Sequence, residues 1–309
     1  MRRSSLRRVL EGVLLSGVPL LLADCLAQSS CPDDGVEPPT PQSLAVESNF
    51  ANGGPLNASQ CTEVCDQAQT GVVTCVRESP ESVLCLTRPF PCEGRRPVGL
   101  RTATQRAANG FDCQLGDAAW LEAASVDAFR VLRRELHAHG APRRLLRAAS
   151  RSMRDERRHA RATRALARTF GVAVASVERE HAPSRSLEAL ALDNAVEGCV
   201  RETWGALIAL RQAARASELS VRAALSRIAR DEVRHAELAF RIDRWLGPRL
   251  SAEQRARIRA ARAAAVSELA EEVRMELPKA ERERLGLPSA REATALLAQL
   301  KGSLWLADA

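Results

Sequence analysis

The chain has 309 residues, of which 45% are apolar, so it is long enough to bury a core in one large or two modest domains. Aromatic residues make up only 3%, and Ala, Leu, Arg and Glu dominate, which is typical of a helical protein. The net charge of +7 comes from arginines spread among Glu and Asp without interleaved aromatic residues, so we expect no nucleic-acid partner. The chain has no tyrosine, which excludes a mechanism based on a tyrosyl radical.

The first 27 residues are typical of an export signal. Two pairs of arginines precede an apolar stretch, 9–23, that is too short to span a membrane. Cleavage after Ala27 would release the mature protein, and the arginine pairs also resemble a twin-arginine signal, which exports folded proteins. Alternatively, the segment that ends at Cys25 resembles a lipobox, with Asp24 in place of the usual small residue, and a lipid on Cys25 would tether the protein to a membrane. We therefore expect an exported protein of the periplasm or outer cell envelope.

Nine cysteines support an oxidising compartment. Seven of them lie between the signal and the first long predicted helix, which predicts a disulfide framework whose pairing is left open. The alternative, a zinc site that includes Cys61 and Cys65, lacks a second close pair or a nearby histidine. Cys199 lies inside a predicted helix, where a buried apolar role is expected. The seven disulfide candidates are Cys31, Cys61, Cys65, Cys75, Cys85, Cys92 and Cys113.

Composition divides the chain into five regions. Pro, Ser, Asn, Gly and Asp are frequent ahead of the cysteine-rich segment, and helical periodicity begins near Asp117. The predicted regions are the export signal over 1–27, a flexible tether over 28–60, a cysteine-rich segment with a linker over 61–115, a helical bundle over 116–246 and a C-terminal helical extension over 247–309.

Four long helices are predicted in the bundle from apolar periodicity and from Gly and Pro at their ends. The connections between them are short, long and short, an order that suits two helical hairpins joined by a long crossover. Two more helices are predicted in the extension, the first with a capping box formed by Ser251 and Gln254. The expected ranges are about 117–139, 142–170, 187–215 and 220–246 in the bundle, and 251–275 and 289–300 in the extension.

The candidate functional residues lie in an internal repeat. Residues 154–160 read Arg-Asp-Glu-Arg-Arg-His-Ala, and residues 230–236 read Arg-Asp-Glu-Val-Arg-His-Ala. Each copy contains Glu-x-x-His, which places a carboxylate and an imidazole on one helix face, one turn apart. One copy, with Glu156 and His159, lies in the second predicted helix, and the other, with Glu232 and His235, lies in the fourth.

Both Glu-x-x-His pairs interrupt an apolar stripe that should face the core. Buried charge is costly without a partner, and a metal ion would supply one. The alternative is a buried hydrogen-bonded network of Glu and His without metal. The repetition of the motif on two helices favours the metal site.

A pair of metal ions needs one further carboxylate from each of the other two helices. On the first helix Glu122 lies among apolar residues at helical spacing. On the third helix the depth within the hairpin favours Glu202, whereas the repeat spacing favours Glu197. A π-bulge would let these two residues, five apart, share a face. We favour Glu202 as the ligand, with Glu197 nearby.

The residues beside the ligands predict a supporting layer. Asp155 and Asp231 precede the two repeat glutamates, and each can accept a hydrogen bond from the histidine of the opposite copy. Arg158 and Arg234 can neutralise these aspartates. The alternative is that all four are ordinary charges on a helix surface.

Taken in chain order, Glu122, Glu156-x-x-His159, Glu202 (or Glu197) and Glu232-x-x-His235 resemble the ligand set of the ferritin-like di-iron carboxylate superfamily, which includes bacterioferritin, rubrerythrin, the ribonucleotide reductase small subunit and the multicomponent monooxygenases. The resemblance covers about 116–246, and the chain most resembles exported ferritin-like domain proteins of myxobacteria. It implies an all-α fold: a ferritin-like four-helix bundle with a long crossover, flanked by a small disulfide-rich N-terminal segment and C-terminal helices.

The same resemblance implies two iron ions, or one manganese and one iron, because hard carboxylates tolerate the ferric state. Its expected partners are dioxygen or peroxide, with an unknown reductant or small-molecule substrate. The implied function is the activation of dioxygen to oxidise that substrate or ferrous iron. The alternatives are an iron-handling protein without turnover of an organic substrate, and a structural module whose metals, zinc included, only hold the bundle together.

Overall fold

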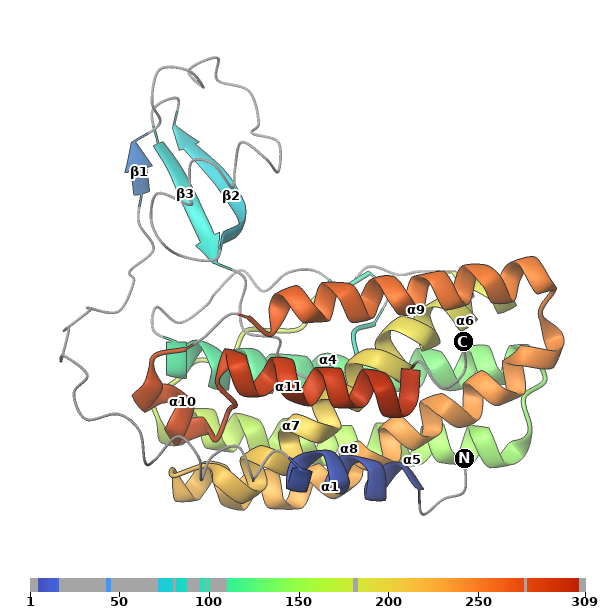
Figure 1. Cartoon of the computed structure of the whole chain (residues 1–309). Helices are drawn as coiled ribbons and strands as arrows, with labels where there is room; N and C mark the ends of the chain where they lie inside the picture. Colours follow the sequence, from blue (N-terminus) through green and yellow to red (C-terminus); the bar gives the residue numbers. More distant parts are fainter. Residues whose placement is uncertain are drawn as a thin grey trace.

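The computed structural model shows a largely helical protein (Figure 1). For the three strands only the backbone is described. The described residues are 5–16, 43–45, 72–79, 82–87, 95–97, 99–100, 110–179, 183–274 and 277–305.

Four helical segments lie side by side and form the main body of the protein (Figure 1). Helix α4 packs against α5, α7 packs against α8, and α5 packs against α8. The third segment changes its winding along its length, because a π-helix, η3, joins α6 to α7. The segments are α4 (Gly110–Ala138), α5 (Arg143–Thr169), then α6 (Leu187–Asp193), η3 (Asn194–Arg201) and α7 (Glu202–Arg215), and finally α8 (Leu219–Leu246).

Two apolar layers hold these helices together. One layer contains Phe129, Leu145 and Ile242, and the other contains Leu115 and Leu207, all at most 5% exposed. Each large aliphatic side chain that leaves water contributes about 1.5–3 kcal/mol. The polar residues of the repeat lie in the same helices as these layers, so apolar packing offsets the cost of burying them.

The long crossover between α5 and α6 is anchored on the first helix. Trp120 donates a hydrogen bond from Nε1 to the carbonyl oxygen of Ser176 over 3.2 Å, and Leu100 forms an antiparallel bridge with Arg179. The connections are therefore short, long and short, as the sequence predicts.

The C-terminal extension consists of α9 (Ala252–Glu272), α10 (Lys279–Leu285), α11 (Ala290–Leu300) and a final π-helical turn, η5 (Lys301–Trp305). The predicted capping box of Ser251 and Gln254 is confirmed. Helix α10 was not predicted; it is only seven residues long, so it offers little periodicity to detect.

Helix α1 (Ser5–Ser16) occupies part of the predicted export signal. Its apolar residues Leu6, Leu10 and Val13 are buried, and the helix packs against α7, α8 and α11. The following segment, with the lipid candidate Cys25, lies outside the described residues. Export and lipidation therefore stay predictions.

The N-terminal third corrects the sequence analysis at two points. Strands β1 (Ser43–Ala45), β2 (Val72–Ser79) and β3 (Ser82–Thr87) form an antiparallel sheet in the order β1-β3-β2, in a region for which no strands were predicted; the tether and the disulfide framework stay predictions. In this sheet Cys75 is the register partner of Cys85. The prediction weighed the cysteines and overlooked the β-branched residues at 72–76. The candidates Cys31, Cys61, Cys65 and Cys92 lie outside the described residues.

The second correction concerns the start of the first long helix. Helix α4 begins at Gly110, so the end of the predicted linker is helical. Cys113 therefore lies on α4, and its thiol donates to Asp117 Oδ2 over 3.6 Å. Phe111 and Leu115 are buried and extend the apolar stripe of this helix toward its N-terminus.

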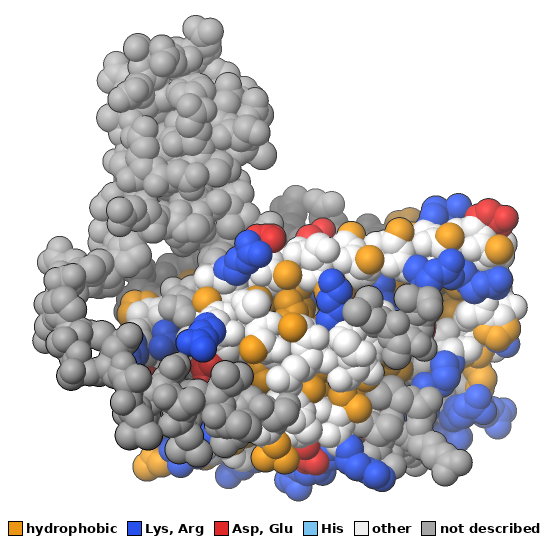
Figure 2. All heavy atoms as spheres, viewed as in Figure 1, with side chains coloured by type: hydrophobic (Ala, Val, Ile, Leu, Met, Phe, Trp, Pro, Cys, Tyr) orange, Lys and Arg blue, Asp and Glu red, His pale blue; other side chains and the backbone are white. Residues whose placement is uncertain are grey.

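Basic side chains are spread over the face seen in Figure 2, with hydrophobic side chains between them. Among the described residues, no helix has the length and apolar character needed to cross a membrane.

Candidate metal centre

The polar residues of the repeat converge in the interior, between the two apolar layers. Glu156 and His159 come from α5, Glu232 and His235 from α8, and Glu122 from α4, and all five are buried. They face inward because Glu and His, three residues apart, lie on the same side of a helix as the apolar stripe.

Four of these residues form a group that can hold a metal ion. Glu122, Glu156, His159 and Glu232 each offer one ligand atom, and these atoms all lie within 4.8 Å of one another. His159 Nδ1 is 3.0 Å from Glu232 Oε1, 3.4 Å from Glu122 Oε2 and 3.8 Å from Glu156 Oε2. The imidazole of one copy of the repeat therefore meets the carboxylate of the other copy.

His235 extends this group on its other side. Its Nδ1 is 2.9 Å from Glu156 Oε1 and 3.5 Å from Glu232 Oε1. The rings of His159 and His235 are 5.8 Å apart, centre to centre. Both rings thus present Nδ1 to a shared set of carboxylates, with approximate symmetry between α5 and α8.

Several atoms in the centre lack a hydrogen bond despite the short distances. Glu156 Oε2, Glu232 Oε1 and the Nδ1 atoms of His159 and His235 have no hydrogen-bond partner within the part of the chain that the structure describes. Each such buried polar group costs about 1–3 kcal/mol. Unsatisfied carboxylate and imidazole atoms aimed at one point are the donor set of a hard or borderline cation, so these residues fit a metal.

Electrostatics in the centre are dominated by burial and by mutual contact. Burial alone would lower the pKa of His159, but Glu122 and Glu232 outweigh it and raise the pKa to about 11. Burial raises the pKa of Glu156, and the nearby Glu122 adds to that rise. The contacts with His235 and His159 lower the pKa of Glu232 against the effect of burial. Without metal, the centre therefore retains protons that a cation would displace.

Two aspartates and two arginines form a ring of charges on the Nε2 side of the two imidazoles and orient them. His159 Nε2 lies 3.2 Å from Asp231 Oδ2, and His235 Nε2 lies 3.5 Å from Asp155 Oδ2. Each aspartate thus faces the histidine of the opposite copy, the arrangement expected from the repeat. Such contacts fix which ring nitrogen is left for a metal.

Two arginines close this ring. Arg158 Nη2 donates to Asp155 Oδ1 over 2.5 Å and to Asp231 Oδ2 over 2.9 Å. Arg234 also bonds to both aspartates, at 3.2 Å in the case of Asp155 Oδ2. These contacts, together with that of His235, lower the pKa of Asp155 although burial would raise it. Asp155 is only 2% exposed and is therefore not an ordinary surface charge, whereas the side chain of Arg158 is 52% exposed, so the ring reaches from the interior to the surface.

The third helical segment places its two glutamates in different environments. The backbone N–H of Glu202 donates to the carbonyl oxygen of Glu197, five residues earlier, as a π-helix requires. Glu197 Oε2 accepts from the backbone N–H of Arg96 over 3.2 Å, and Arg201 lies 4.0 Å from its other oxygen. Both oxygens of Glu202 are buried and have no hydrogen-bond partner within the described ranges.

Glu202 lies close enough to the centre to interact electrostatically with His235 and Glu232, although it is not one of the four residues that share the tightest group. Burial raises its pKa to about 7, and Arg95 opposes this rise. The structure thus leaves the carboxylate of Glu202, rather than that of Glu197, available to a cation.

Sequence reasoning missed Arg95, which is 2% exposed and lies next to the π-helix. Its Nη2 donates to Asp193 Oδ2 over 2.7 Å, and its carbonyl oxygen accepts from Ser125 over 3.0 Å. A Cβ atom at Gly198 would lie 3.2 Å from Arg95 Nη1, so the glycine permits this close approach. A single arginine in a predicted linker gives no sequence signal of such burial.

No protein-family model, curated protein or solved structure matches the chain.

Proposed function

We propose that the four helical segments form a ferritin-like bundle that holds two iron ions and uses dioxygen to oxidise a small-molecule substrate. The observation that carries this proposal is the convergence of buried carboxylate and imidazole atoms that lack hydrogen bonds. Two ions, rather than one, are favoured because each copy of the repeat supplies its own glutamate and histidine.

In this proposal His159 and His235 would each hold one ion through Nδ1. Glu156 and Glu232 each lie within 4 Å of both histidines, and their carboxylates together with those of Glu122 and Glu202 would complete the ligand set. Four carboxylates balance four positive charges, so the loaded centre is close to neutral in its buried setting.

A bound pair of ferrous ions would supply electrons to dioxygen, which is the redox chemistry that carboxylates and imidazoles lack. The chain itself contributes the surroundings. The apolar layers flank the centre, Asp231 is hydrogen-bonded to Nε2 of His159, and Asp155 lies 3.5 Å from Nε2 of His235, so both rings are oriented with Nδ1 toward the carboxylates. The absence of tyrosine excludes the storage of an oxidising equivalent on a tyrosyl radical.

The test is to load the metal-free protein with ferrous iron without oxygen, count the bound iron, and then follow oxygen consumption and absorbance after mixing with oxygen. We expect two iron ions per chain and rapid oxygen consumption. Glu156→Ala and Glu232→Ala should each bind less iron and lose the oxygen reaction. Glu271→Ala, at an exposed position on α9, is the matched control and should behave like the unmodified protein.

The outcomes separate the alternatives. Binding of no more than one ion would refute the paired centre. Two tightly held zinc ions, with no oxygen reaction after iron loading, would make the protein a metal-stabilised structural module. Continuous oxidation of excess ferrous iron, without any effect of organic compounds, would make it an iron-handling protein.

A further inference from the structure

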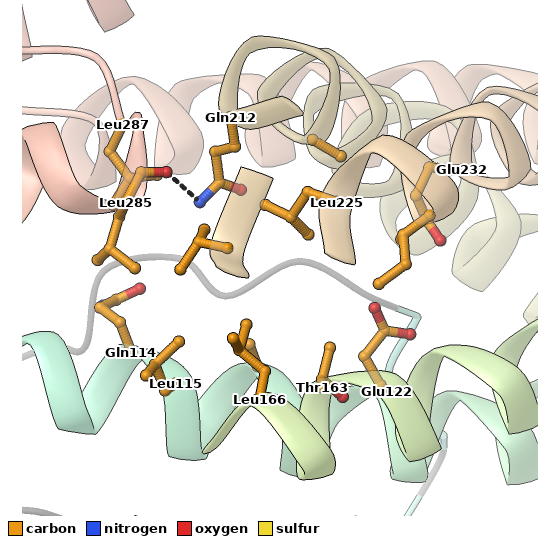
Figure 3. Close-up of a pocket in the computed structure, with 14 residues that line it drawn as sticks. Gln114, Leu115, Glu122, Thr163, Leu166, Gln212, Leu225, Glu232, Leu285 and Leu287 are labelled. Atoms are coloured by element: carbon orange, nitrogen blue, oxygen red, sulfur yellow. Dashed lines mark hydrogen bonds between the residues drawn. The ribbon is translucent and has the colours of Figure 1, made fainter. Parts of the chain in front are cut away.

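A cavity lies beside the candidate metal centre, between α4 and α5 on one side and α7 and α8 on the other (Figure 3). Its volume is about 80 Å³, and it is partly open to solvent. Glu122 and Glu232 lie at one end, and Leu285 and Leu287 lie at the other (Figure 3). The cavity therefore leads from the centre toward the segment that follows α10.

The exposure of the ligand residues shows that this cavity is the open side of the centre. Glu122 and Glu232, which line it, are 8% and 7% exposed. Glu156, Glu202 and His235, which do not line it, are 1–2% exposed. A molecule that reaches the centre through the described part of the protein therefore meets Glu122 and Glu232 first.

The walls between the two ends are mainly apolar. Leu115, Leu166 and Leu225 line it (Figure 3), and Ile228 lines it as well. The hydroxyl of Thr163 donates to the carbonyl oxygen of His159 over 2.9 Å, so its proton is already used. Along these walls a polar ligand would lose hydrogen bonds to water without gaining replacements, whereas an apolar ligand has no such hydrogen bonds to lose.

The far end of the cavity is fixed by the C-terminal extension. Gln212 Nε2 donates to the carbonyl oxygen of Leu285 over 3.0 Å (Figure 3). Gly286 has a φ of 70°, and a Cβ atom there would lie 2.4 Å from the backbone nitrogen of Ala216. Ser217 N–H also donates to Glu283 O over 2.9 Å. The segment is thus seated tightly on the turn between α7 and α8, and the cavity has a defined shape.

We propose that this cavity binds the end of an unbranched alkyl chain and presents it to the metal centre. The lining runs along α4 from Gln114 to Glu122, about 12 Å at 1.5 Å per residue, and a volume of about 80 Å³ spread over that length leaves a narrow space, so the end of a slender chain fits where a ring does not. The partly exposed Gln114 and Gln212 at the leucine end leave room for a polar part of the same molecule to stay in water. The proposal names the substrate class of the proposed function and rests on it for the role of the glutamate end.

The test uses 1-hexanol and cyclohexanol as probes, with binding to the metal-free protein measured by ligand-observed NMR. We expect 1-hexanol to bind at least roughly tenfold more tightly than cyclohexanol, a difference of about 1.4 kcal/mol. Ala118→Phe, which fills the cavity from α4, should weaken 1-hexanol binding by a similar factor. Ala138→Phe, at an exposed position on the same helix, is the matched control. Leu225→Phe is a second filling variant in case the first does not fold.

A second measurement keeps the two proposals separate. Cobalt(II) is bound to the protein, and its visible absorption is recorded with and without 1-hexanol. Normal cobalt binding with no 1-hexanol binding, or equal binding of both alcohols, would overturn the alkyl-chain proposal and leave the metal proposal intact. Binding of 1-hexanol by a protein that takes up no cobalt would refute the metal centre instead. A spectrum that changes with 1-hexanol in the control but not in Ala118→Phe supports both.

Discussion

The two helical hairpins of the main body carry the same seven-residue motif but support it differently. In the first hairpin, α4 and α5 are regular α-helices, and Glu122 faces the cavity. In the second, the π-helix η3 precedes Glu202, which is buried on the side of Arg95. The second hairpin is also braced by α9, where Arg201 bonds to Glu272 at 2.9 and 3.0 Å.

This difference shows how a symmetric ligand set can acquire an open and a closed side. The closed side is built from contacts that bring distant segments onto η3: Arg95 bonds to Asp193, and Arg185 lies 2.6 Å from the other oxygen of the same carboxylate. The open side borders the cavity, which both hairpins line, with Glu122 from the first and Glu232 from the second. The contacts around Asp193 thus hold the side of the centre that faces away from the cavity.

The largest expected effect tests whether the two hairpins contribute equally. His159→Ala and His235→Ala should each lower the affinity for one of the two ions by more than roughly 100-fold, because a direct ligand matters at least as much as the residues behind it. Titration with cobalt(II), followed by its absorption, measures both sites. Loss of both ions in one variant and neither in the other would show that the halves are not equivalent.

The next largest effect is expected on the pH dependence of stability, through Glu202 on the closed side of the centre. The pKa of Glu202 is raised to about 7 from 4.5, so the folded metal-free protein holds a proton that the unfolded chain releases. Stability without metal should therefore fall as pH rises from 4.5 through 7, with a contribution from Glu202 on the order of 3 kcal/mol. His159, with its pKa raised to about 11, acts in the same direction above pH 6.5.

Urea unfolding at pH 5 and pH 7.5 measures this slope, the change of the free energy of unfolding with pH. The range stays above the region in which Asp155, with its lowered pKa, loses its own contribution as pH falls. Glu202→Gln should reduce the slope, and zinc-loaded protein should show the opposite trend because metal binding competes with protons. If the free energy of unfolding changed with pH as much in Glu202→Gln as in the unmodified protein, Glu202 would not belong to the buried centre.

A smaller effect is expected from the aspartates behind the histidines. Asp155→Asn and Asp231→Asn should each lower metal affinity by roughly 10–100-fold, because the amide no longer neutralises the opposite imidazole or the arginines. Calorimetric titration with zinc checks this value, and Asp127→Asn on the outer part of α4 serves as the control. A drop as large as that of the histidine variants would show that the aspartates bind metal themselves.

The smallest effect contrasts glycines of the two hairpins. At Gly198 a Cβ would lie 2.7 Å from Ala239 Cβ, so Gly198→Ala should destabilise the protein by about 1–2 kcal/mol. At Gly116 the nearest atom is at 3.4 Å, so Gly116→Ala should be neutral or stabilise by up to about 1 kcal/mol, the gain in helix propensity. Thermal unfolding of both variants measures the contrast. A neutral Gly198→Ala would mean that the close packing at the π-helix is not required.

Much of the fold followed from local signals. The helices of the body and the two longer helices of the extension are long and have recognisable starts or ends, such as Gly140, Gly171 and the Ser251 cap, so their ranges agree with the structure to within a few residues, except where α4 begins seven residues early. The strands were missed because short β segments among cysteines and turn residues carry weak patterns. Helix α10 was missed because a seven-residue helix depends on its packing rather than on its own sequence.

In the candidate site, too, some residues could be predicted from the sequence and others could not. Glu156, His159, Glu232 and His235 were identified because helical spacing alone puts each pair on one face. The choice between Glu197 and Glu202 stayed open, because a regular helix cannot place two residues five apart on the same side, and whether it unwinds into a π-helix depends on its neighbours.

By itself the sequence determined which helix faces turn inward and which donors they carry, since both follow from spacing along a single helix. Only the tertiary structure decided that Arg95 is buried beside η3, that Glu202 rather than Glu197 lacks a hydrogen-bond partner among the described residues, and that Leu285 and Leu287 form the far end of a cavity that begins at Glu122 and Glu232. The reason is that these features arise from contacts between residues far apart in the chain, and the free energy of such contacts is set by packing rather than by local pattern.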